Sequence, residues 1–105
     1  MEAKTSEVKG LVKEIFGIGL FGKVTSRQME KYDGDMIMLS HGLSPHPIAV
    51  VVPAYGKIYV TKKRYERKTQ RFVEKYKDRF NELLSIERAY AHQYFSEFGW
   101  MTDFA

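Results

Sequence analysis

The sequence predicts an α+β fold with two N-terminal helices, a three-stranded antiparallel meander, and a long C-terminal helix packed on the sheet or in a homodimer. Three observations predict it. Apolar residues recur at helical spacing near both ends, three short β-branched runs lie between them, and neither proline nor glycine interrupts residues 63–98. A chain of 105 residues is expected to form one domain, 1–105.

The first helix is predicted over residues 6–16. Thr5 or Ser6 is expected to cap its start by accepting a backbone N–H bond, and Gly17 is expected to end it in a left-handed turn. One helical face collects the apolar residues Val8, Leu11, Val12, Ile15 and Phe16.

A short second helix is predicted after the glycine-rich connector at 17–22. Thr25 or Ser26 would cap it, and it would run through Arg27, Met29 and Tyr32. The dipeptide at 33–34, Asp-Gly, would stop it.

Three strands are predicted at 36–39, 48–52 and 58–61. Segments rich in glycine and proline separate them, and such spacing is typical of an antiparallel meander. Val50, Val51 and Val52 form a continuous β-branched run. The second strand is therefore expected to be central and covered on both faces.

The last element is predicted as one long helix, or two nearly collinear ones, over residues 63–98. Apolar and aromatic residues recur there every three or four positions, and Gly99 stands where a C-terminal cap belongs. An aromatic tail follows at 98–105.

Positive charge is concentrated in one segment. The chain has a net charge of +4, yet residues 57–79 contain ten basic and three acidic residues, a net charge of +7. Because the rest of the chain is near neutral or acidic, this segment favours an acidic partner.

On a helix, six of these cations fall within an arc of about 120°, next to an arc of aromatic residues. Such a face suits contact with phosphates, so we expect a non-enzymatic accessory or regulatory protein that binds the DNA or RNA backbone. Lys57, Lys62 and Lys63 would extend the same surface. The six cations of the arc are Arg64, Arg67, Lys68, Arg71, Lys75 and Arg79.

An alternative is a protein-interaction module or inhibitor that docks on an acidic protein partner. It would use the same cations or the aromatic C-terminus, where large side chains exceed what one helix face can bury. Some of these aromatics could equally meet a second copy in a homodimer. The candidate partner-binding residues are Tyr94, Phe98, Trp100 and Phe104.

The sequence contains no complete catalytic or metal-binding motif, so no cofactor and no metal is expected. Residues 17–23 match the letters of a dinucleotide or phosphate loop, but Val24 replaces the required hydroxyl and the preceding segment is predicted as helix. His41, His46 and His92 match no known metal spacing. A glycine-permitted turn explains 17–23 better.

The chain contains no cysteine, which excludes disulfide-rich secreted domains and thiolate metal sites. It also shows neither a signal peptide nor an apolar stretch of about 20 residues. A cytoplasmic location without membrane contact is therefore expected.

Overall fold

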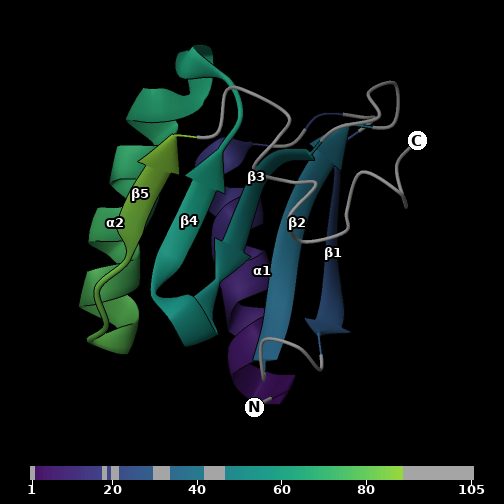
Figure 1. The fold of residues 1–105 in the computed structure, drawn as a ribbon, viewed down its shortest axis with the longest axis vertical. Coiled ribbons are helices and arrows are strands. Elements are labelled where there is room, and N and C mark those ends of the chain that lie inside the picture. The colour runs from purple at the N-terminus through teal and green to yellow at the C-terminus, as the bar shows by residue number, and fades with distance from the viewer. Residues whose placement is uncertain (1, 18, 20–21, 30–33, 42–46, 89–105) are drawn as a thin grey trace.

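A computed structural model describes residues 2–17, 19, 22–29, 34–41 and 47–88. It shows a five-stranded mixed sheet in the order β1-β2-β3-β4-β5, with helices α1 and α2 on one of its faces (Figure 1). The α+β class is confirmed. The predicted arrangement is wrong, because the described residues form one N-terminal helix and five strands where two helices and a three-stranded meander were expected.

Helix α1 (Glu2–Phe16) starts earlier than predicted. Gly17 ends it with a φ of 57°, and its N–H donates to the carbonyl of Lys13 at 3.0 Å, which confirms the left-handed end. Thr5 does not cap the helix, because it lies within the first turns. Its Oγ1 donates instead to Oδ2 of Asp35 at 2.7 Å and ties α1 to strand β2.

The second predicted helix is wrong, because its residues belong to strand β1 (Gly22–Met29). β1 lies at the edge of the sheet and pairs antiparallel with β2 (Gly34–His41), from Gly22 opposite His41 to Met29 opposite Gly34. Lys23 and Ser26 are exposed on it, whereas Val24 and Thr25 are half-buried. An edge strand of this kind lacks the apolar alternation that would have identified it.

The three predicted strands correspond to β2, β3 (Pro47–Val52) and β4 (Lys57–Val60), which pair antiparallel in sequence order. Thr61, the last residue of the third predicted strand, lies just beyond the end of β4. β3 is the third of five strands and all six of its residues are buried, so the prediction of a central, doubly covered strand is confirmed. A short 3₁₀ turn, η2 (Pro53–Tyr55), connects β3 to β4 and ends at Gly56 with a φ of 62°.

Helix α2 (Glu66–Phe80) follows the 3₁₀ turn η3 (Lys63–Tyr65) and is much shorter than the predicted helix. Asn81 ends it with a φ of 55°, its N–H donating to the carbonyl of Lys77 at 2.8 Å. Asparagine tolerates this left-handed conformation better than other residues with a Cβ. The predicted helical stretch 89–98 and the tail 98–105 lie outside the described residues.

Strand β5 (Ser85–Arg88) takes the place of the expected helix continuation. It pairs parallel with β4, from Lys57 opposite Ser85 to Val60 opposite Arg88. The N–H of Ser85 also donates to the carbonyl of Gly56 at 2.7 Å, which holds the start of β5 beside β4. The sequence predicts helix here because Leu83, before β5, and Glu87, within it, continue the three- and four-residue spacing of α2.

The main core lies between the helices and the sheet. It joins α1, α2 and alternate residues of β2, β3 and β4, and the half-buried Val24 and Ile86 pack against it. Its members are Val8, Leu11, Val12, Ile15, Phe16, Ile37, Leu39, Ile48, Ala49, Val51, Ile58, Phe72, Tyr76 and Leu84.

The cap at Asn81 makes the first testable prediction. Replacing Asn81 by alanine should lower the free energy of unfolding by about 1 kcal/mol, because alanine is strained at positive φ. Glycine at the same position should match or slightly exceed the wild type. Urea unfolding of the two variants measures this, and an alanine variant as stable as the glycine variant would contradict it.

A polar cluster joins the start of α1 to the end of α2. The Lys4 ammonium forms an ion pair with Glu82 and lies 5.9 Å and 5.8 Å from the ring centroids of Tyr76 and Phe80. The Tyr76 hydroxyl is buried and has no hydrogen-bond partner among the described residues. Burial raises the pKa of Tyr76, and the nearby Lys4 only partly offsets that rise.

We expect Tyr76→Phe to be neutral or to stabilise the protein by up to about 1 kcal/mol at pH 7, because it removes an unsatisfied buried hydroxyl. Above pH 10 Tyr76 ionises in the unfolded protein, whereas in the folded protein its raised pKa keeps it protonated to higher pH. Wild-type stability should therefore fall faster than that of the variant as the pH rises above 10. Urea midpoints at neutral and alkaline pH measure both effects, and parallel pH curves for the two proteins would refute the second.

Candidate nucleic-acid interface

The connection between β4 and α2 is held in one conformation by hydrogen bonds. Thr61 donates its backbone N–H to the Ile48 carbonyl at 3.1 Å, and its Oγ1 lies 2.8 Å and 2.9 Å from the carbonyl oxygens of Pro47 and Ile48. The N–H of Tyr65 then donates to the carbonyl of Lys62 at 3.0 Å and closes η3. Lys62, Lys63 and Arg64 are all exposed on this fixed turn.

A ladder of aromatic rings determines which side of α2 faces solvent. Phe72 and Tyr76 are fully buried, their centroids are 5.9 Å apart, and Phe16 of α1 lies 6.1 Å from Phe72. Buried Thr69 donates its hydroxyl to the Tyr65 carbonyl at 2.8 Å, so it adds no unsatisfied polar group. Because this side is fixed against α1 and the sheet, the opposite side of α2 must point outward.

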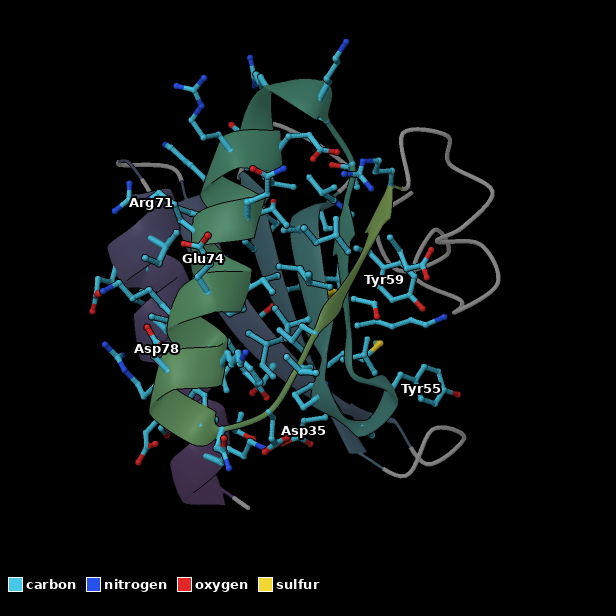
Figure 2. All side chains as sticks on the ribbon, turned by 90° about the vertical axis from the view of Figure 1, so that its left-hand side faces the viewer. Asp35, Tyr55, Tyr59, Arg71, Glu74 and Asp78 are labelled. Carbon is cyan, nitrogen blue, oxygen red and sulfur yellow. The ribbon has the colours of Figure 1, made fainter. Side chains whose placement is uncertain are left out.

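The cations predicted for this segment lie on that outward side. We call the eight cations of the predicted set that follow β4, all of them exposed, the basic face, and Arg71 marks its middle in Figure 2. Along α2 it extends about 18 Å from Arg67 to Arg79. Its members are Lys62, Lys63, Arg64, Arg67, Lys68, Arg71, Lys75 and Arg79.

Some of these cations already have partners within the chain. Lys68 donates to the Phe16 carbonyl at 3.1 Å, at the C-terminal end of α1, and Arg79 lies 3.6 Å from Oε1 of Glu14. The Arg64 guanidinium stacks 5.1 Å from the centroid of the Tyr65 ring. These contacts orient the edges of the basic face.

The other five cations form no ion pair or side-chain hydrogen bond within the described part of the chain. They are Lys62, Lys63, Arg67, Arg71 and Lys75. Their charged groups are therefore available to an anion.

Lys57 was expected to extend this surface, but it lies apart from it. Lys57 is the first residue of β4, at the opposite end of the strand from Lys62. Because side chains alternate along a strand, Lys57 lies on the same face of the sheet as Tyr59, which points away from α2 (Figure 2). Its Nζ is 3.4 Å from Oε1 of Glu87. Lys57 therefore belongs to a separate surface.

Acidic residues interrupt the outer side of α2 only in part. Glu66 is engaged by Arg88, whose Nε lies 2.6 Å from Oε1 of Glu66. Glu74 and Asp78 are exposed along the same side of the helix as Arg71 (Figure 2), yet neither forms an ion pair with the cations of the described residues. The net charge of this side remains positive.

The fold itself gains little from this arrangement of charge. Cations four residues apart, such as Arg67 with Arg71 and Arg71 with Lys75, destabilise a helix by roughly 0.2–0.5 kcal/mol per pair. Arg67 and Lys68 also lie in the first turn, where the helix dipole is positive and only Glu66 is acidic. An anion bound near the N-terminal half of α2 would relieve both penalties.

The other sites that the sequence raised are a metal site and a nucleotide-binding loop. No group of three or more His, Asp or Glu side chains among them is placed to hold a metal ion. The glycine-rich segment follows helix α1 and precedes strand β1, the reverse of the order that a nucleotide-binding loop requires. His46, His92 and the aromatic candidates Tyr94, Phe98, Trp100 and Phe104 lie outside the described residues, as does the side chain of His41.

Within the described ranges, no helix is long and apolar enough to cross a membrane. Comparison of the chain with protein families, curated proteins and solved structures gives no match. The basic face is therefore interpreted from its own geometry.

Proposed function

We propose that this protein binds nucleic acid through the basic face, and that it does so by contacting backbone phosphates without catalysis. One observation carries the proposal: five exposed cations on a rigid helix and its adjoining turn have no anionic partner within the described chain. Charges placed at a cost to helix stability are most simply explained by a partner that compensates them.

The chemistry of the face suits phosphate. Arg64, Arg67 and Arg71 can each donate two parallel hydrogen bonds to phosphate oxygens, while the lysines act as point charges. A span of about 18 Å covers several phosphates of one strand or one duplex groove. Because contacts to backbone phosphates carry no base information, binding through phosphates predicts little sequence preference.

Fluorescence anisotropy with labelled duplex and single-stranded oligonucleotides, titrated at several salt concentrations, tests the proposal. Five contacts predict a slope of log K against log[salt] of about −3 to −5 for duplex DNA, because each neutralised phosphate releases condensed counterions. Poly-glutamate serves as the control polyanion for an acidic protein surface. Tighter binding to poly-glutamate than to either oligonucleotide, or a slope near zero, would reject nucleic acid as the partner.

A further inference from the structure

The sheet has a second apolar face, on the side away from α1 and α2. Side chains alternate along strands, so the neighbours Met38, Val50 and Tyr59, which are paired in register, share one face. Met36 and Val52 continue that face on β2 and β3. None of these five residues belongs to the core between the helices and the sheet.

The apolar part of this second face, over β2, β3 and the middle of β4, is shielded from solvent, whereas Lys57 and Glu87 at its β4–β5 edge remain partly exposed. Met36 and Val50 are 0% exposed, Val52 is 1% exposed, and Tyr59 is 5% exposed. Exposed strand faces of antiparallel sheets normally carry polar residues. Apolar side chains at these exposures require a layer of protein over them.

The described residues do not supply that layer. Both helices lie on the other face (Figure 1), and Tyr59 points away from α2 (Figure 2). Among the described segments outside the sheet, the short turn η2 alone lies near this face, at one end of β3, where Ala54 and Tyr55 are themselves exposed. The cover must therefore come from a segment beyond the described ranges or from a second molecule.

We infer that residues 89–105 of the same chain pack over this face and form a third layer of the domain. The segment begins directly after Arg88, at the end of the edge strand β5. Crossing from β5 to β1 takes four strand spacings, about 19 Å, whereas 17 extended residues reach about 56 Å. The segment is thus long enough to cross the entire sheet.

Amino-acid composition favours residues 89–105 over the other undescribed segments as the cover of this face. The internal stretches outside the described ranges, 18, 20–21, 30–33 and 42–46, are at most five residues long and hold between them only five large apolar residues, Ile18, Leu20, Phe21, Tyr32 and Leu43. Residues 89–105 are dense in side chains that bury large apolar areas and pack well against methionine. They are Tyr90, Tyr94, Phe95, Phe98, Trp100, Met101 and Phe104.

The inference changes the expected role of the C-terminus. Tyr94, Phe98, Trp100 and Phe104, which the sequence suggested as partner-binding residues, would instead be internal to the domain. The inference about residues 89–105 does not depend on the basic face, because the second face of the sheet and the outer side of α2 are separate surfaces.

Nuclear Overhauser effects (NOEs) in the full-length protein test the inference. With ¹³C-labelled methionine and valine methyl groups, the methyls of Met36, Met38 and Val50 should show NOEs to aromatic protons of residues 90–104. Conservative Met36→Leu and Met38→Leu variants assign the two methionine signals, and Met29 on edge strand β1 provides an internal comparison. The indole protons of Trp100 are unambiguous, since it is the single tryptophan.

A mixed sample of labelled and unlabelled protein separates contacts within one chain from contacts between chains. NOEs within one chain are the expected result. Isotope-filtered NOEs that appear only between differently labelled chains would overturn the inference and assign the face to a second copy. The absence of any NOE from the methyl groups of these three residues to the aromatic protons of 90–104 would also overturn it.

Discussion

Replacing Arg67, Arg71 and Lys75 together by glutamine should lower the affinity for duplex DNA by about 10- to 100-fold near 50 mM salt. These three residues are exposed along the centre of the basic face and have no partner in the described chain. Removing three phosphate contacts should also make the salt slope about 2 to 3 units shallower. Anisotropy titrations of wild type and variant at several salt concentrations measure both quantities.

A matched control separates this local effect from the loss of overall charge. Lys13→Gln, Lys23→Gln and Lys57→Gln together remove the same number of charges from positions outside the basic face. The control variant should keep most of the affinity, because charges beyond about 8–10 Å from the contact are screened. If both triple variants lost affinity equally, binding would depend on net charge and the basic face would have no special role.

Replacing Phe72 by alanine should lower the free energy of unfolding by about 3–5 kcal/mol. Its ring is fully buried between α1 and α2 and contacts both Phe16 and Tyr76, so truncation leaves a cavity at the centre of the aromatic ladder. Small domains have only about 5–15 kcal/mol of stability in total. The variant should therefore be marginally folded, and it should bind nucleic acid weakly because α2 loses its support.

Urea unfolding followed by circular dichroism measures the loss. Gln70→Ala, at an exposed position two residues earlier on the same helix, should change stability by less than about 0.5 kcal/mol. Phe72→Leu should fall between the two, since it restores part of the buried volume. A loss below 1 kcal/mol for Phe72→Ala would show that the ladder does not anchor α2.

Strands β2, β3 and β4 and the first helix were predictable because their signals are local. Val8, Leu11 and Ile15 repeat at helical spacing, and Val50 to Val52 form a β-branched run between turns. Strand β1 escaped prediction because an edge strand with Lys23 and Ser26 exposed shows no apolar alternation. Its assignment depends on pairing with β2, and that pairing is not visible in the sequence of β1 itself.

The end of α2 and strand β5 could not be located for a different reason. Asn81 is a weaker helix stop than glycine or proline, and no other breaker occurs before Gly99. The parallel pairing of β5 with β4 connects residues almost thirty positions apart, from Lys57 to Ser85. The single asparagine of the chain, Asn81, was the sequence feature that could have indicated the end of α2.

The basic face was largely predictable because the helical period separates its cations from Thr69, Phe72 and Tyr76. The sequence could not reveal which cations are already engaged. Lys68 reaches the end of α1 and Arg79 reaches Glu14 only because the two helices pack side by side. Lys57 was misplaced for the same reason, since its position depends on the direction of β4 in the sheet.

The central claim, that the outer side of α2 contacts phosphates, is tested most directly by adding a short duplex to ¹⁵N-labelled protein. The claim predicts that the guanidinium Nε–Hε signals of Arg67 and Arg71 and the backbone amides of 62–75 shift progressively, and that 0.5 M salt reverses the shifts. Shifts confined to β1 and β2, or none at low salt, would contradict it.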